Sequence, residues 1–153
     1  PISRNRGIMQ GALKLAQARL SVATLDQLGA AALYGVDPGY FDATRNEYRR
    51  RRDTCYRKLL EIPGIVTTEP QGAFYTMAKL PVDSTERFQL YLLQEFEDNG
   101  ETVMFAPGSG FYATPGAGTS EIRIAYVTAA EKLRRAVEVL GHGIQAYNAQ
   151  NRS

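Results

Sequence analysis

The sequence predicts an α/β fold in which helices come first and a small sheet follows. Apolar residues recur at helical spacing from Gly7 to Ile62, and after Pro63 they fall in short runs typical of strands. Of the 153 residues, 44% are hydrophobic and 22% are charged, as in a globular protein rather than a disordered one. This length suffices for one domain with a real core and is short for two.

The composition excludes several classes of protein. A single cysteine rules out an internal disulfide framework and a cysteine-based zinc site, and a single histidine, His142, rules out a histidine-rich metal centre. A net charge of +2 does not indicate nucleic-acid binding. No apolar run approaches the ~18 residues of a membrane span. We therefore expect a cytoplasmic protein with no metal, nucleic-acid or membrane partner.

The first five residues, Pro-Ile-Ser-Arg-Asn, contain no initiator methionine. Their pattern is typical of a strand end that enters a turn. We therefore expect this chain to be a piece of a longer protein.

Two helices are predicted before the long one. The segment from Gly7 to Leu20 has amphipathic helical spacing. Thr24 and Gln27 have the spacing of a capping box, in which side chains bond the free N–H groups of a first turn. This box predicts an alanine-rich helix up to about Tyr34, which the turn residues 35–39 end.

A long helix is predicted from Tyr40 to about Glu61, because apolar residues recur at spacings of three, four and seven. Pro63 ends it, since proline cannot extend a helix. Cys55 falls on the apolar face and is expected in the core. The run Arg49-Arg50-Arg51-Arg52 points in four directions around the helix, close to Glu47 and Asp53. It indicates a solvated surface rather than a nucleic-acid patch.

The second half predicts strands and two helices. Strands are expected at 65–67, 73–77, 102–105 and 121–127. A capping box at 83–86 predicts a helix from Thr85 to Asp98, and one at 128–131 predicts a last helix that reaches about Leu140. His142 would then lie past that helix end and bond its terminal carbonyls. The polar residues 148–153 are expected to fray.

Arg123 is the strongest candidate for chemistry. Alternation along the predicted strand puts it on one face with Ala125 and Val127. A guanidinium among apolar residues needs an anion, and its planar fork suits a carboxylate. The partner could be a ligand carboxylate or an internal one from Glu121 or Glu101. A third possibility is an exposed arginine on an edge strand.

The glycine-rich loop 106–120 resembles a phosphate-binding loop only superficially. It lacks a closing Gly-Lys-Ser/Thr, and the next segment is predicted as a strand, so no helix N-terminus is available for a phosphate. Its glycines are expected to permit tight turns and close backbone approach.

Three motifs together resemble the class I/II, fold-type I pyridoxal-phosphate aminotransferases, and in particular aspartate aminotransferases. They are the turn from Pro70 to Tyr75, the Pro-Gly-x-x-Phe loop from Pro107 to Phe111, and the strand around Arg123, in family order and spacing. The likeness is strong from Pro70 on and loose before it. It implies the family's small domain, with a mainly antiparallel sheet and helices packed on one face.

The resemblance also implies a domain organisation and a cofactor. Residues 1–38 would be the remnant of a large cofactor-binding domain, 39–63 a connecting helix, 64–147 the small domain and 148–153 a tail. The family's Schiff-base lysine and its other groups that bind pyridoxal phosphate have no counterpart here. We therefore expect no catalytic and no cofactor-binding residue in this chain, and no transamination by the chain alone.

By the same resemblance, Arg123 would bind the α-carboxylate of an amino-acid substrate and of a 2-oxo acid, in a homodimeric enzyme. Arg19 is a weaker candidate near the substrate, because its segment runs close to the site in the family. Two other functions stay open. One is a stand-alone, ferredoxin-like domain that binds or senses a small ligand without catalysis, and the other is a structural interaction domain.

Overall fold

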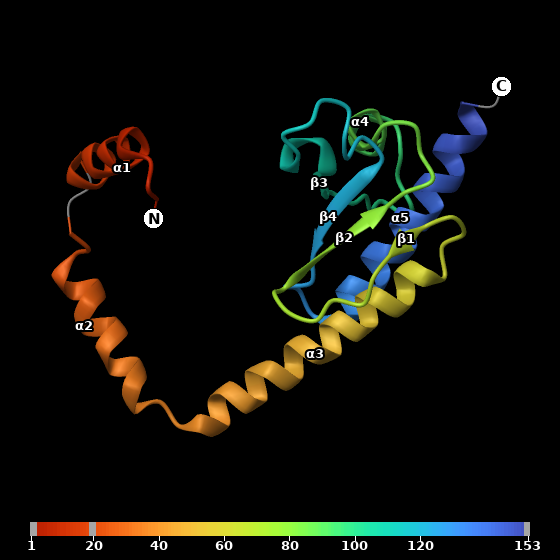
Figure 1. The fold of residues 1–153 in the computed structure, drawn as a ribbon. Helices are drawn as coiled ribbons and strands as arrows, with labels where there is room; N and C mark the ends of the chain where they lie inside the picture. Colours follow the sequence, from red (N-terminus) through yellow and green to blue (C-terminus); the bar gives the residue numbers. More distant parts are fainter. Residues whose placement is uncertain (1–2, 19–20, 152–153) are drawn as a thin grey trace. The chain divides into compact units, whose positions relative to one another are not determined.

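The structure is a computed structural model and describes residues 3–18 and 21–151. Helices come first and the sheet second, as predicted (Figure 1). The elements are α1 (Arg6–Ala18), α2 (Thr24–Ala32), the 3-10 turn η1 (Leu33–Gly35), α3 (Pro38–Leu60), β1 (Val66–Thr67), β2 (Tyr75–Lys79), α4 (Thr85–Gln94), β3 (Ala106–Pro107), the 3-10 turn η2 (Gly108–Phe111), β4 (Glu121–Ala125) and α5 (Ala130–Gln150).

The chain divides into two compact units, Pro1–Phe41 and Asp42–Ser153. In the first unit, α1 and α2 contain no buried residue among those described. The predicted capping box of α2 is wrong: Ala23 is the N-cap, and no side chain caps the helix. The Gln27 amide instead donates to the Val22 carbonyl at 2.7 Å. The assignment of this segment to a larger domain stays a prediction.

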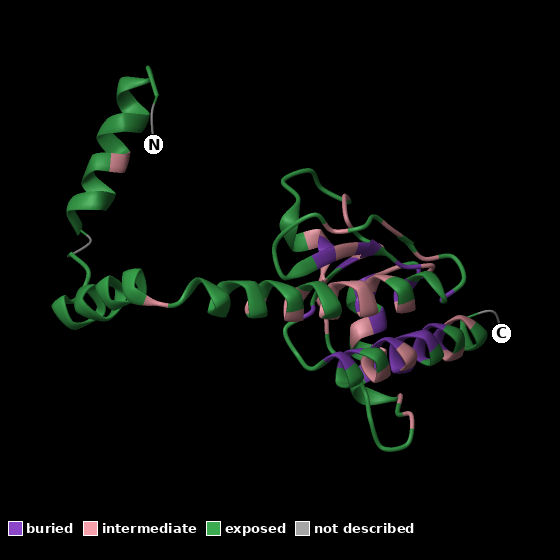
Figure 2. Ribbon diagram, turned by 90° about the horizontal axis from the view of Figure 1, so that it is seen from below, coloured by how far each residue is buried: buried purple, intermediate pink, exposed green. Residues whose placement is uncertain are grey.

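The second unit contains the core. Residues from α3, α4, α5 and the inner face of the sheet pack together, and the buried positions run along α5 in Figure 2. Phe88, Leu92, Leu59 and Ile122 are fully buried. Cys55 lies in this cluster as predicted, and burial raises the pKa of its thiol to about 12. The predicted fold class, an α/β domain with a small antiparallel sheet, is confirmed.

The sheet has four strands in the order β1-β2-β4-β3, and every neighbouring pair is antiparallel. Thr76, Ala78 and Ile122 face the core, whereas the alternate positions Tyr75 and Arg123 are exposed. Since β4 lies between β2 and β3, it is an interior strand. The edge-strand interpretation of Arg123 is therefore wrong.

The strand predicted at 102–105 is not formed, and β3 begins at Ala106 instead. Hydrogen bonds between side chains and backbone groups join this segment to α4 in place of a neighbouring strand. The Gln89 amide oxygen accepts from the Phe105 N–H at 2.9 Å, and the Thr102 hydroxyl donates to the Leu92 carbonyl at 2.7 Å. The segment is thereby bound to α4 without ladder pairing.

Helix α4 begins at Thr85 as predicted but ends at Gln94, four residues earlier than expected. Its N-cap is Ser84, whose hydroxyl accepts from the Arg87 N–H at 3.4 Å. Asp83 forms an ion pair with the Arg87 side chain and accepts from the Tyr147 hydroxyl at 2.9 Å. Hydrogen bonding to Tyr147 is the main cause of the lowered pKa of Asp83.

Helix α5 is longer than predicted and continues through Gly141 and Gly143 to Gln150. Ala129 is its N-cap and no side chain caps it, so the predicted box at 128–131 is wrong. Both glycines are buried, and a Cβ at Gly143 would lie 2.6 Å from Leu92 Cδ2. The glycines therefore permit close helix packing rather than ending the helix.

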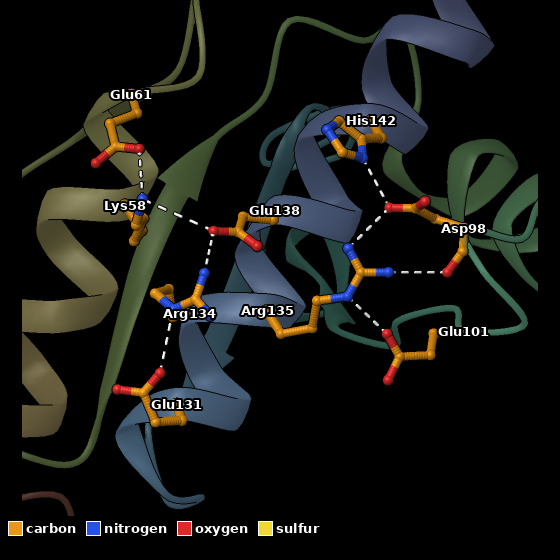
Figure 3. A network of polar contacts seen from close by, with 9 residues as sticks. All are labelled: Lys58, Glu61, Asp98, Glu101, Glu131, Arg134, Arg135, Glu138 and His142. Atoms are coloured by element: carbon orange, nitrogen blue, oxygen red, sulfur yellow. Dashed lines mark hydrogen bonds and ion pairs between the residues drawn. The ribbon is translucent and has the colours of Figure 1, made fainter.

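His142 lies inside α5 and not past its end, so its predicted role at terminal carbonyls is wrong. Its Nδ1 lies 2.7 Å from the Asp98 carboxylate. Arg135 donates to Asp98 at 3.0 Å and to Glu101 at 2.6 Å (Figure 3). These contacts join the turn at Asn99, which has a φ of 56°, to the last helix.

Candidate carboxylate-binding site

The three sequence motifs meet around Arg123. Strand β2 follows the turn that begins at Pro70, the loop motif follows β3, and both strands pair with β4. Arg123 is the register partner of Met77 on β2 and of Ala106 on β3. The Arg123 side chain projects from the exposed face of the sheet, because side chains alternate along a strand and its neighbours Ile122 and Ile124 point toward the helices.

The turn of the first motif is held against β4 by Tyr126. This side chain is 1% exposed, and its hydroxyl donates to the Gly72 and Ala73 carbonyls at 3.3 and 3.2 Å. Ala73 has a φ of 60°, so the chain reverses sharply before β2. Burial raises the pKa of Tyr126, so its hydroxyl remains a hydrogen-bond donor well above neutral pH. The turn thereby sets the position of Tyr75.

Two aromatic rings contact the Arg123 guanidinium. Its Cζ lies 4.5 Å from the Phe111 ring centroid and 5.3 Å from the Tyr75 ring centroid. Both distances are within the range of cation–π attraction. One ring comes from β2 and the other from η2, which follows β3. Both rings belong to the sequence motifs, at Tyr75 and Phe111, but neither was predicted to contact Arg123.

No carboxylate of the described residues pairs with Arg123. Glu101 pairs with Arg135 at 2.6 Å, and the Glu121 carboxylate accepts from the Tyr112 hydroxyl. The two internal ion pairs considered from the sequence are therefore absent within the described part of the chain. Arg123 is exposed and therefore hydrated, so it does not need the internal anion that was expected from its apolar neighbours in the strand. What remains is an exposed guanidinium with its donors available to a ligand.

The loop that carries Phe111 is fixed at several points. A Cβ at Gly108 would lie 2.7 Å from the Glu121 carbonyl oxygen, and one at Gly118 would lie 2.5 Å from the Tyr112 ring. The Ser109 hydroxyl donates to Glu86 at 2.6 Å. The loop is therefore packed tightly on β4 and tied to α4, and its glycines permit the close approach that the sequence predicted.

Arg19 is outside the described residues. Within the arginine run, the exposed Arg50 bonds Glu47, as expected for a solvated helix surface. Arg51 and Arg52 are instead half-buried, and they donate to the Val127 and Pro70 carbonyls at 2.6 and 3.4 Å. Among the residues described, no helix combines the length and apolarity needed to cross a membrane.

Among the described residues around Arg123, no lysine is placed in an apolar pocket where it could carry pyridoxal phosphate. Among the described residues of the four strands, Lys79 is the lysine on the exposed face of the sheet. It ends β2 and is the register partner of Glu121. It is exposed, whereas a nucleophilic lysine is activated by desolvation in an apolar pocket or by a cationic neighbour. No cofactor-dependent step is therefore assigned to the residues of this chain. What the fold and Arg123 define is a candidate site for carboxylate recognition on a small α/β domain.

Comparison with known proteins gives the family. Residues 3–140 match the family model of aminotransferases of class I and II. The chain is 32% identical over 133 residues to the aspartate aminotransferase of Bacillus subtilis, which covers 82% of this chain and 31% of that protein. The chain belongs to the class I and II aminotransferases, a family of pyridoxal-phosphate-dependent enzymes. The resemblance proposed from the three motifs is thereby confirmed.

Solved structures agree. An alanine aminotransferase from Pyrococcus furiosus superposes on this chain with a TM-score of 0.70 at 32% sequence identity. The match covers 87% of this chain and 33% of the chain of that enzyme. An α-aminoadipate aminotransferase from Thermus thermophilus superposes with a TM-score of 0.74 at 23% sequence identity, which shows the shared fold. This match covers 95% of this chain and 37% of the chain of that enzyme. The chain thus spans about a third of the length of these relatives.

Proposed function

We propose that this chain is the C-terminal part of an aminotransferase and that Arg123 binds the α-carboxylate of its substrates. The observation that supports this most is the exposed guanidinium of Arg123, which contacts two rings and pairs with no carboxylate of the described residues. Its position in a strand of the family's third motif also supports the role. Aspartate is the first amino donor to test, because several relatives are named aspartate aminotransferases.

The role of Arg123 in the proposed reaction is binding and orientation. Its planar fork can donate two parallel hydrogen bonds to one carboxylate. Two bonds fix the rotation of the substrate about its carboxylate and so the direction of its Cα–H bond. Pyridoxal phosphate, when bound by the rest of the enzyme, supplies the electron sink for amino-group transfer. The isolated chain would be inactive, and the whole enzyme would be a cytoplasmic homodimer.

The coding sequence upstream of Pro1 tests this proposal. An open reading frame that encodes Ser-x-x-Lys and then Gly-x-Arg shortly before Pro1 would supply the missing groups. The longer protein should then transfer the amino group of aspartate to a 2-oxo acid, and it should take up pyridoxal phosphate with an absorbance band that borohydride abolishes. A start codon next to Pro1 behind an in-frame stop codon would contradict the proposal and favour a stand-alone binding domain.

A further inference from the structure

The guanidinium of Arg123 is exposed, yet its surroundings are organised. An arginine side chain on a protein surface samples many rotamers and loses that freedom when it binds a ligand. Two rings from opposite flanks of β4 contact this one. Each ring attracts the cation through its π face and leaves the N–H groups at the guanidinium edge free to donate.

Neither ring belongs to the hydrophobic core. Phe111 is 48% exposed and Tyr75 is 42% exposed, so burial alone does not explain their positions. Tyr75 has Phe74 as an edge-to-face neighbour at 5.8 Å between ring centroids. Phe111 ends η2, whose first residue, Gly108, is packed against the Glu121 backbone. Both rings therefore have defined supports although they face solvent.

The support of Phe111 includes a second contact to the strand that carries Arg123. The Tyr112 hydroxyl donates to the Glu121 carboxylate, and this hydrogen bond is the main cause of the raised pKa of Tyr112. The same hydrogen bond engages the Glu121 carboxylate, which lies two residues from Arg123 on the same face of β4. The loop thus brings a ring to the guanidinium and engages the nearest acidic group of the same strand.

We propose that Tyr75 and Phe111, hereafter the aromatic pair, are positioning residues for Arg123. They restrict the guanidinium before the substrate arrives, so that binding a carboxylate costs less side-chain entropy. This inference rests on the proposed function of Arg123. It adds that the affinity for the carboxylate depends on two residues that need not touch the substrate.

The test uses the full 153-residue chain, isotopically labelled, in NMR titrations with sodium acetate and L-alanine. Sodium chloride at equal ionic strength is the control for salt. We expect saturable shifts of the β4 amide resonances with both carboxylates and none with chloride. Tyr75→Leu and Phe111→Leu should each raise the dissociation constant by about threefold to tenfold. Arg123→Leu should abolish the saturable shifts.

Conservative variants separate positioning from a general loss of structure. Tyr75→Phe and Phe111→Tyr keep the rings and should bind carboxylate within about twofold of the unaltered chain. Tyr48→Leu is the control, because the Tyr48 ring also lies 5.3 Å from an arginine, Arg51, but comes from α3 and does not contact Arg123 as the aromatic pair does. It should leave the dissociation constant unchanged. The Arg123 side-chain protons should show an upfield ring-current shift that Phe111→Leu removes.

The outcomes distinguish the two proposals. If both leucine variants bind carboxylate as tightly as the unaltered chain while Arg123→Leu does not bind, the aromatic pair has no positioning role and the function of Arg123 stands. The same conclusion follows if no ring-current shift is seen. If the unaltered chain shows no saturable shift, or if Arg123→Leu leaves it intact, carboxylate binding by Arg123 is wrong and the positioning role falls with it.

Discussion

The Phe111 ring centroid lies 4.5 Å from Cζ of Arg123, although twelve positions of sequence separate the two residues. The contact depends on a loop that leaves β3, closes through Gly108 and Gly118, and returns into β4. An exposed arginine on an interior strand is thereby combined with a ring supplied by a loop. This arrangement is the basis of the predictions about Arg123.

Replacing Arg123 should affect binding more than stability. The side chain is exposed and loses only two ring contacts in Arg123→Ala, so the free energy of unfolding should fall by about 1 kcal/mol or less. Arg135→Ala is the matched comparison, because it removes hydrogen bonds to Asp98 and Glu101. Urea denaturation should rank Arg135→Ala as the less stable variant. The reverse order would favour a purely structural role for Arg123.

The glycine at position 108 should not tolerate a side chain. Gly108→Ala places a Cβ 2.7 Å from the Glu121 carbonyl oxygen and 2.8 Å from the Gly118 carbonyl oxygen, and backbone atoms cannot move away cheaply. We expect a loss of about 1–3 kcal/mol in the free energy of unfolding. Gly110→Ala, in the same turn with no atom within 4 Å of its Cβ, is the control and should cost about 0.5 kcal/mol or less. Equal losses for both variants would refute this packing.

The Asp98 carboxylate should stabilise the fold in a pH-dependent way. Hydrogen bonds from His142 first and from Arg135 next lower its pKa in the folded state. As the pH falls, the unfolded state therefore takes up a proton before the folded state does. The contribution of Asp98 to the free energy of unfolding is present above about pH 4 and is lost as the pH falls through the lowered pKa. Asp98→Asn should therefore be less stable than the unaltered chain at about pH 5, with the gap closing toward about pH 2. A gap in the urea midpoint that stays constant over this range would contradict the assignment.

The buried Cys55 thiol should produce the opposite dependence at alkaline pH. Burial raises its pKa to about 12, whereas an unfolded thiol titrates near about 8.5. Between these values the unfolded state ionises and the folded state does not, so stability falls as the pH rises. Relative to Cys55→Ala, the unaltered chain should lose about 1 kcal/mol between about pH 8 and pH 9.5. No change in that difference would show that the thiol is solvated in the folded chain.

The sequence predicted the order of the elements and the face on which Arg123 lies. Both follow from local periodicity: apolar residues at helical spacing up to Ile62, and alternation along 121–125. It failed where tertiary contacts override a local signal. Helix α5 runs through Gly141 and Gly143, which ordinarily weaken helices, because Ile62 and Leu92 pack against them.

The partners of Arg123 were not predictable from spacing. The guanidinium contacts Phe111 because of where a long loop closes, and no periodic pattern encodes that closure. The same holds for β3, which begins at Ala106 because Gln89 bonds the preceding backbone. The three motifs did identify the segments that meet at the site, since they occur together in the family.

The most direct test of the account is the discrimination between a carboxylate and an amide at the substrate α-carbon. The longer aminotransferase should be assayed with an L-amino acid and with the corresponding amino-acid amide, as the unaltered enzyme and as Arg123→Met. We predict that Arg123→Met lowers kcat/KM for the acid by an amount equivalent to a loss of about 3 kcal/mol or more in transition-state stabilisation. The variant should also lose most of the preference of the enzyme for the acid over the amide. An unchanged preference in Arg123→Met would show that another group binds the α-carboxylate.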